Sequence, residues 1–386
     1  MVIYLKNIIM VNKKDDHHHI ENECSFKALK VNSGISQPPS INPNVAARLK
    51  NKKRKRYSVD DYIKGILDGN MTILSQAITL VESAKFEHQK IAQEIIERCL
   101  PHSGKSLRIG ITGVPGAGKS TFIEAFGQHV TGKGHKLAVL AIDPSSERTN
   151  GSILGDKTRM EALAIDPNAY IRPSPSAGSL GGVARKTRET LLLCEAAGFD
   201  TILIETVGVG QSETAVHSMV DFFLLIQIAG AGDELQGIKR GIMEMADTIA
   251  INKCDGNNIN KAKLARVQFE NALHLFPLSP SGWSPKVLSC SSIEGTGIPE
   301  IWTNIMDYCE HTKANNYFET HRSEQAKYWM YETIHEQLHD NFYHNSKINS
   351  MIPNFENKVL NDEISSFVAA YKLLNTYYDE VKEGNE

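Results

Sequence analysis

A chain of 386 residues exceeds one minimal domain, so it predicts one large domain with appendages or two domains. Hydrophobic residues make up 41% and charged residues 23%, and a net charge of −3 excludes a general attraction to nucleic acid or anionic lipid. The six cysteines include no CxxC pair, which argues against a zinc or redox site and favours a reducing, intracellular setting. The longest apolar stretch, 222–232, is about half as long as the roughly 20 residues of a membrane helix. We therefore expect a cytoplasmic protein with no membrane and no nucleic-acid partner.

The first 56 residues are polar, and we expect them to form a disordered leader. Near its end is a basic run at 50–56, which we interpret as a solvated linker, with a nucleic-acid or targeting patch as the alternative. Three histidines follow two aspartates at 15–19. They could hold a metal ion, but we interpret them as part of the disordered tail.

A helical extension is predicted over 57–103. Ser58 is a candidate N-cap, because Asp61 completes an S-x-x-D pattern typical of a capping box. Apolar residues then recur at helical spacing, and two further helices are predicted over 71–83 and 87–99.

Short apolar runs alternate with helical stretches over 104–306. The runs are LRIGITG, KLAVLAID, TILIET, DFFLLIQIAG, TIAINK and KVLSCS. This alternation predicts an α/β fold with a doubly wound, mainly parallel sheet. Ligands of such sheets bind at the carboxyl ends of the strands, so the residues that follow the runs are expected to converge.

Aromatic residues recur at helical spacings over 307–386, where the strand-like runs stop. We interpret most of them as the core face of a C-terminal helical arm. An arm this small and aromatic is also expected to mediate self-association, as a homodimer.

A G-x-x-x-x-G-K-[ST] motif, GVPGAGKS, lies between the run LRIGI and the helix that begins STFIEAFG. This context predicts a P-loop, whose backbone N–H groups and helix N-terminus hold phosphates. Lys119 would reach the β and γ phosphates, the Ser120 hydroxyl would ligate magnesium, and Thr121 can donate to the α phosphate. The predicted phosphate-binding residues are Gly113, Val114, Pro115, Gly116, Ala117, Gly118, Lys119, Ser120 and Thr121.

An N-K-x-D element follows the run TIAI, as Asn252-Lys253-Cys254-Asp255. The Asp255 carboxylate can accept hydrogen bonds from N1–H and the 2-amino group of guanine. Adenine offers neither donor, and such sites can discriminate by about four orders of magnitude. Lys253 can lie over the base, and Asn252 can tie this loop to the P-loop. The sequence therefore predicts a GTPase that binds GTP or GDP.

The loop after the last strand is expected to complete the base site. Its backbone could contact the guanine O6 through Ser291, Ser292 and Ile293. Cys254 and Cys290 are expected near one another there, and we interpret them as packing residues, not as a redox pair.

The carboxylates that take part in GTP hydrolysis are expected at the ends of strands. Glu205 ends TILIE and begins Glu-Thr-Val-Gly208, the place for a magnesium-linked carboxylate and a glycine that senses the γ phosphate. Asp143 ends KLAVLAID and Asp156 follows in GSILGDKTRM, where carboxylates hold metal-bound water or orient the attacking one. For Asp156, spacing alone leaves a surface turn equally open.

The segments LAIDPSSERTNGSILGDKTRM, IRPSPSAGSLGGVARKTRETLLLCEAAGFD, ETVGVGQSE and GAGDELQGIKRGIMEMAD resemble the MeaB/MMAA/ArgK family of SIMIBI-class GTPases. The resemblance runs from about Ser58 to about Leu374 and leaves out the leader. It implies slow GTP hydrolysis, stimulated by adenosylcobalamin-dependent methylmalonyl-CoA mutase. Hydrolysis in this family gates cobalamin loading and protects the mutase from oxidative inactivation. The resemblance also implies a homodimer formed through the C-terminal arm, and we expect no direct cobalamin binding.

The same resemblance assigns residue roles. It implies the carboxylates Asp143, Asp156 and Glu205 as the magnesium and catalytic set, which act beside Lys119 of the P-loop. It also implies Asp233, Gln236 and Lys239 as a client-responsive switch III. The Glu of Glu-Thr-Val-Gly, where generic GTPases carry Asp, agrees with the family.

Three alternatives to this function exist. The older interpretation of ArgK as a kinase of transport proteins suggests a P-loop phosphotransferase, but the N-K-C-D element argues against an ATP-using kinase. The client could be another acyl-CoA mutase, such as an isobutyryl-CoA type. A nickel-delivery GTPase would need Cys or His clusters near the switches, and the histidines between 107 and 309 are isolated.

Overall fold

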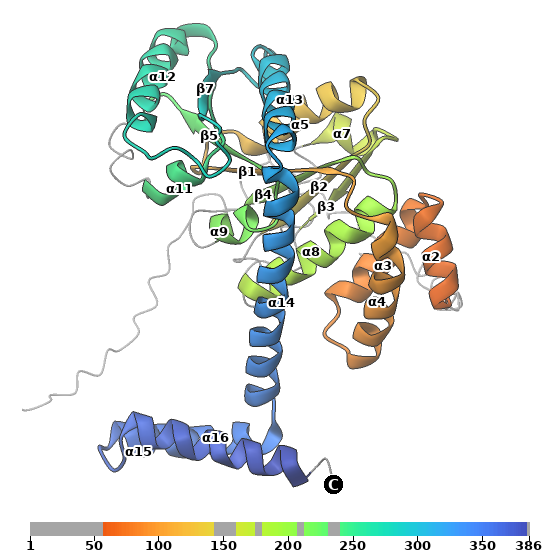
Figure 1. Ribbon diagram of the computed structural model, residues 1–386, viewed down its shortest axis with the longest axis vertical. Coiled ribbons are helices and arrows are strands. Elements are labelled where there is room, and N and C mark those ends of the chain that lie inside the picture. Colours follow the sequence, from red (N-terminus) through yellow and green to blue (C-terminus); the bar gives the residue numbers. More distant parts are fainter. Residues whose placement is uncertain (1–56, 143–159, 174–179, 207–211, 231–239, 384–386) are drawn as a thin grey trace, which may run out of the picture. The chain divides into compact units, whose positions relative to one another are not determined.

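The protein is described here from a computed structural model (Figure 1). The described residues are 57–142, 160–173, 180–206, 212–230 and 240–383. Contacts divide the chain into two units, 1–56 and 57–386, and every described residue belongs to the second. The leader, with its basic run and its histidines, therefore lies outside the described residues.

Three α-helices precede the first described strand. They are α2 (Val59–Leu67), α3 (Met71–Glu82) and α4 (Phe86–Cys99), followed by the 3-10 turn η2 (Leu100–His102). The capping box predicted at Ser58 is present: its hydroxyl accepts the Asp61 N–H, and the Asp61 carboxylate accepts the Ser58 N–H at 2.9 Å. Asn70 caps α3 by accepting the N–H groups of Thr72 and Ile73.

The described strands form one seven-stranded sheet in the order β3-β2-β4-β1-β5-β6-β7, and every pair is parallel. The strands are β1 (Leu107–Gly113), β2 (Leu137–Ile142), β3 (Ala169–Arg172), β4 (Thr201–Thr206), β5 (Phe222–Ile228), β6 (Thr248–Asn252) and β7 (Lys286–Ser289). The carboxyl ends of β1, β4 and β6 therefore share one edge. The predicted doubly wound, parallel fold class is confirmed.

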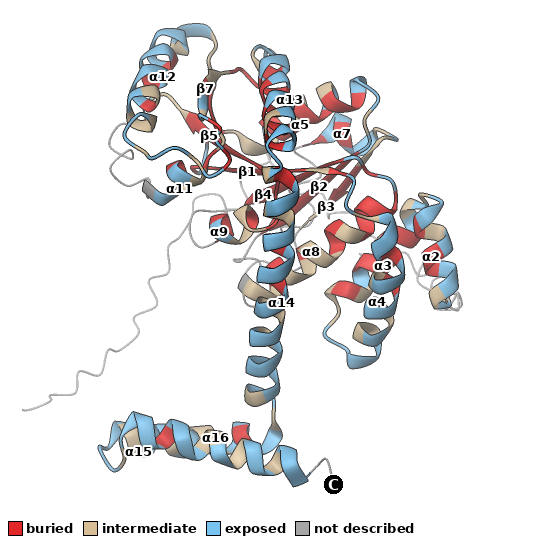
Figure 2. Cartoon of the chain, in the orientation of Figure 1, coloured by how far each residue is buried: buried red, intermediate tan, exposed pale blue. Residues whose placement is uncertain are grey.

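Helices cover both faces of this sheet (Figure 1). The described connections contain α5 (Lys119–Gly132), α7 (Glu161–Ile165), α8 (Leu180–Ala196), α9 (Ser212–His217), α11 (Arg240–Met245), η4 (Gly256–Asn258), α12 (Ile259–Leu273) and α13 (Ile298–Ala314). Leu203 packs into a core with α5, α7 and α13. Ile202 and Ile204, which point the other way, pack with α2, α3, α4, α8 and α9. Strands buried on both faces are expected to be continuous apolar runs. Figure 2 shows β1, β2, β4, β5 and β6 buried along nearly their whole length, whereas the edge strands β3 and β7 are buried only in part.

Three helices end the chain: α14 (Tyr317–Tyr343), α15 (Ser346–Leu360) and α16 (Ser366–Glu383). The interpretation of most aromatics there as a core face is wrong. Phe318 and Trp329 are buried, but six others are exposed: Tyr328, Tyr331, Tyr343, Phe367, Tyr371 and Tyr378. For the three on α16, the reason is that α15 and α16 pack mainly on each other and no second described layer covers them. The other three lie at exposed positions of α14.

None of the described helices is both long and apolar enough to span a bilayer.

Candidate nucleotide-binding site

The P-loop joins β1 to α5 at the carboxyl edge of the sheet. Two of its positions require glycine. A Cβ on Gly113 would lie 2.2 Å from the Ile226 carbonyl oxygen of the neighbouring strand. Gly118 precedes α5 with φ +86°, and a Cβ there would lie 2.9 Å from the Asn252 Nδ2. These close approaches shape the loop, so its backbone N–H groups can turn toward a phosphate.

Lys119 is the first residue of α5, and its Nζ donates to the Gly113 carbonyl across the loop at 2.8 Å. Burial lowers the pKa of Lys119, while the nearby charges of Glu205 and Glu213 act in the opposite direction. The cation is thus partly desolvated at the mouth of the loop. It is available to exchange its carbonyl partner for a phosphate oxygen.

Ser120 and Glu205 face one another because β1 and β4 are neighbours, with Ile111 in register with Glu205. The Ser120 Oγ lies 3.5 Å from the Glu205 Oε1, and the glutamate is buried. A hydroxyl and a carboxylate are hard oxygen donors of the kind that Mg²⁺ prefers, so the residues present fit this ion. The described ranges contain no group of three or more His, Cys, Asp or Glu that could hold a metal.

The base loop begins at Asn252, the last residue of β6. Its Nδ2 donates to the Ala117 carbonyl at 2.9 Å, so the expected tie to the P-loop is present. Its Oδ1 accepts the Ser292 hydroxyl at 2.8 Å and the Ser292 N–H at 3.2 Å. One buried amide therefore joins the phosphate loop to both base loops.

Asp255 is held by Ser291, whose hydroxyl donates to the Asp255 Oδ2 at 2.5 Å. This bond orients the carboxylate, which is half-buried. Lys253 is exposed and has φ +59°, a left-handed conformation uncommon for a residue with a side chain. Ile293, the next residue after Ser292 in the loop that follows β7, is 83% exposed. Sequence reasoning assigned only the backbone of Ser291 and missed its hydroxyl, which the Ser-rich composition of the loop could have suggested.

Cys254 and Cys290 lie near one another, as expected, because the Cys254 N–H donates to the Cys290 carbonyl at 2.9 Å. Their side chains pack into different cores, Cys290 with α5 and α13 and Cys254 with α11 and α12. Burial raises the pKa of Cys290 to about 12. The interpretation as packing residues agrees with this arrangement.

Several predicted site residues lie outside the described ranges, and the structure tests none of their roles. They are Asp143, Asp156, Gly208, Asp233, Gln236 and Lys239. A residue that sequence reasoning missed is Glu213 of α9, which is buried and whose charge acts on Lys119. The only signal for it was its place shortly after Glu-Thr-Val-Gly.

The sheet, the P-loop and the N-K-C-D loop together define a P-loop protein with a guanine-type base site. The family model described as "Methylmalonyl Co-A mutase-associated GTPase MeaB" matches residues 74–347. A "Putative GTPase" of Caulobacter vibrioides is 48% identical over 83% of this chain and 98% of that protein. "GTPase ArgK" of Escherichia coli is 48% identical over 73% and 86%.

Two further relatives extend the comparison. The "Methylmalonic aciduria type A homolog, mitochondrial" of Mus musculus is 46% identical over 84% of this chain and 80% of that protein. The crystal structure of a "LAO/AO transport system kinase" has a TM-score of 0.66 and 38% identity, covering 84% of this chain and 99% of that one. The chain therefore belongs to the MeaB family of methylmalonyl-CoA mutase-associated GTPases, and it is a GTPase.

Proposed function

We propose that this GTPase acts as a chaperone of an adenosylcobalamin-dependent methylmalonyl-CoA mutase. It hydrolyses GTP slowly alone and faster with its client, and hydrolysis gates cofactor loading and protects the mutase. The observation that carries the proposal is family membership over residues 74–347, which include the P-loop and both base loops. The bond from Asn252 to the Ala117 carbonyl supports it, because base recognition and phosphate binding then act as one site.

In the phosphate half of the site, Lys119 would bind the β and γ phosphates, supported by its place at the mouth of the P-loop. Ser120 and Glu205 would hold Mg²⁺, together with Asp143 and Asp156. Bound Mg²⁺ neutralises charge on the β and γ phosphates. The remaining proposed phosphate contacts are Gly113, Val114, Pro115, Gly116, Ala117, Gly118 and Thr121, with Gly208 at the γ phosphate.

In the base half, Asp255 would accept the N1–H and 2-amino hydrogens of guanine, with Ser291 holding one carboxylate oxygen. Lys253 would lie over the base, and the loop of Ser292 and Ile293 would contact its O6. Asn252 would hold the two halves together. Both GTP and GDP fit this description, because the base contacts do not involve the γ phosphate.

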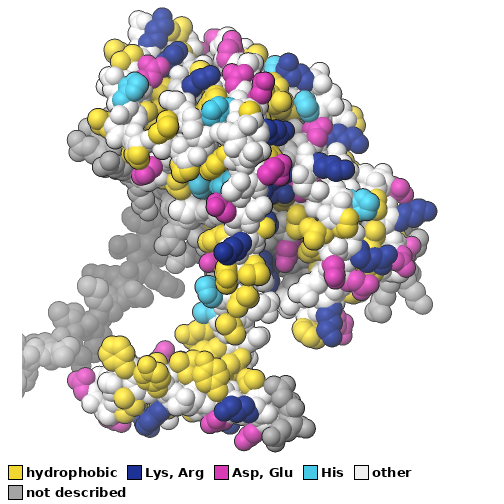
Figure 3. All heavy atoms as spheres, viewed as in Figure 1, with side chains coloured by type: hydrophobic (Ala, Val, Ile, Leu, Met, Phe, Trp, Pro, Cys, Tyr) yellow, Lys and Arg dark blue, Asp and Glu magenta, His cyan; other side chains and the backbone are white. Residues whose placement is uncertain are grey.

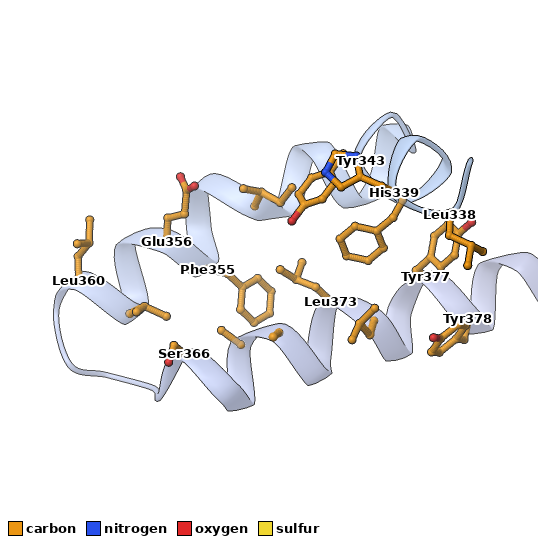
Figure 4. A pocket seen from close by; sticks show the side chains of 16 residues that line it. Leu338, His339, Tyr343, Phe355, Glu356, Leu360, Ser366, Leu373, Tyr377 and Tyr378 are labelled. Carbon is orange, nitrogen blue, oxygen red and sulfur yellow. The ribbon is translucent and has the colours of Figure 1, made fainter. Parts of the chain in front are cut away.

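We also propose a homodimer formed through the C-terminal helices. The ends of α14, α15 and α16 enclose an apolar groove of ≈ 800 Å³. Phe355, Leu373 and Tyr377 line it (Figure 4), and Figure 3 shows hydrophobic side chains gathered over α15 and α16. An apolar groove of this size at a helix pair needs a covering surface, and the same groove of a second copy is self-complementary in chemistry.

Asp233, Gln236 and Lys239, which lie outside the described residues, would form the switch that responds to the client. No direct contact with cobalamin is proposed. A cytoplasmic location is supported by the described cysteines, which are all free thiols and suit a reducing compartment.

The test mixes the purified full chain with a purified adenosylcobalamin-dependent methylmalonyl-CoA mutase and measures GTP turnover. The mutase should raise kcat, and the two proteins should co-elute in gel filtration with a dependence on GTP or GDP. Lys239→Ala should lose the increase, whereas Lys261→Ala, an exposed lysine of α12, should keep it. Absence of both a complex and an increase would remove this client and leave another acyl-CoA mutase as the candidate.

A second candidate, a P-loop phosphotransferase, is favoured only by the name of the similar solved structure, a transport system kinase. Thermal denaturation with magnesium separates the two. GTP and not ATP should raise the melting temperature, because adenine lacks the N1–H and 2-amino donors that Asp255 would accept. A preference for ATP would support the kinase.

A further inference from the structure

The connection from α9 to β5 lies between the nucleotide site and the C-terminal helices. On one side, α9 follows β4, which carries Glu205, and α9 itself holds the buried Glu213 whose charge acts on Lys119. On the other side, residues 218–221 lead from α9 into β5. A displacement of these residues would therefore shift α9 as well.

Three side chains of α14 bind this connection. Trp329 Nε1 donates to the Ser218 carbonyl at 3.0 Å, and Gln325 Nε2 donates to the Val220 carbonyl at 2.7 Å. Arg322 forms a bidentate ion pair with Asp221: its Nε donates to the Oδ1 at 2.7 Å and its Nη2 donates to the Oδ2 at 2.6 Å. The three residues follow one another at spacings of three and four, so they share one face of the helix.

These contacts are directional, and two of the three side chains are buried. Trp329 is 7% exposed and Gln325 is 3% exposed. The Ser218 carbonyl lies just past the end of α9, where carbonyl groups lack partners within the helix, so the indole N–H supplies one. Arg322 also donates to the carbonyl groups of Gly104 and Ser106, which fixes the start of α14 beside β1.

The same helix also rests on α8. Arg185 Nε lies 3.8 Å from the Glu336 Oε2, and a Cβ on Gly181 would lie 2.1 Å from the Glu336 Oε1. The Arg188 guanidinium lies 5.9 Å from the centre of the Trp329 ring. Val183 and Val216 share one core with Trp329, so α8, α9 and α14 contribute to the same core.

We propose that Arg322, Gln325 and Trp329 of α14 are positioning residues for α9, so that the C-terminal helices set the rate of GTP turnover through α9. They touch no substrate and act through the connection at 218–221.

The test compares two tryptophans in the full chain. Trp329→Phe keeps an aromatic ring but removes the N–H donor to Ser218. Trp283→Phe is the matched control, because Trp283 is 9% exposed and its Nε1 donates to the Asp247 carbonyl at 3.1 Å, away from α14. Both variants lose one buried hydrogen bond of the same kind and should lose similar thermal stability.

Turnover should differ between them. We expect kcat of Trp329→Phe to fall roughly threefold to tenfold, the loss of about one hydrogen bond, with an unchanged dissociation constant for GTP. Trp283→Phe should keep the wild-type kcat. Gln325→Met, which removes the donor to Val220 at similar size, should act like Trp329→Phe. Wild-type kcat in both folded α14 variants, or an equal loss of kcat in Trp283→Phe, would overturn the positioning role.

Discussion

The carboxyl edge of the sheet, called the nucleotide edge below, and the C-terminal helices differ in how their side chains are held and covered. At the nucleotide edge, backbone geometry and buried hydrogen bonds fix each group, as when Asn252 joins the P-loop to the base loops. In α15 and α16, apolar side chains stand exposed around a groove. The described contacts of the first region come from within one chain, whereas the second has an apolar surface that no other described element covers.

The largest effect is expected from Lys119→Ala at the nucleotide edge. Removing the cation that is proposed to bind the β and γ phosphates should lower kcat/KM by about two to three orders of magnitude. Steady-state GTP hydrolysis measures this. Lys133→Ala is the control, because Lys133 is exposed at the other end of the same helix. Normal turnover in Lys119→Ala would mean that the P-loop takes no part in hydrolysis.

A smaller effect is expected from Gly118→Ala, which tests how far backbone geometry defines this edge. The φ of +86° is unfavourable for a residue with a side chain, and a Cβ would lie 2.9 Å from the Asn252 Nδ2. The free energy of unfolding should therefore fall by about 1–3 kcal/mol. The bond from Asn252 to Ala117 should weaken and GTP should bind less tightly. Thermal denaturation and nucleotide titration are the measurements.

Gly132→Ala is the matched control on the same helix. A Cβ at Gly132 meets nothing within 4 Å, so that variant should be as stable as the wild type or more stable. Equal behaviour of the two alanine variants would show that the left-handed turn at Gly118 is not needed.

The smallest effect on the isolated chain is expected from Tyr378→Asp in the groove. Tyr378 lines the groove and is 54% exposed, so the folded monomer should tolerate the change, while the proposed dimer would have to bury a charge. Analytical ultracentrifugation should show a shift toward monomer. Tyr331→Asp, at 49% exposure on α14 and outside the groove, should leave the association unchanged. A dimer unaffected by Tyr378→Asp would place self-association elsewhere.

The sequence alone was informative wherever function depends on residues close together in the chain. The P-loop needs glycines beside a lysine on one strand-to-helix turn, and the base loop needs Asn252, Lys253 and Asp255 within four positions. Alternating apolar runs also predicted the parallel sheet, because strands buried on both faces must be apolar throughout. These patterns are local, so they can be read without knowing what packs where.

Only the tertiary structure decided the contacts between distant residues. The Ser291 hydroxyl meets Asp255 across 36 positions, and Trp329 meets Ser218 across 111. Helical spacing in α14–α16 predicted an aromatic core face, but most of those aromatics are not buried, because periodicity reports which residues share a face and not what covers it. At the nucleotide edge the chain itself supplies the neighbours. At the C-terminal helices the sequence determines the apolar face, and a second copy would bury it in the proposed homodimer.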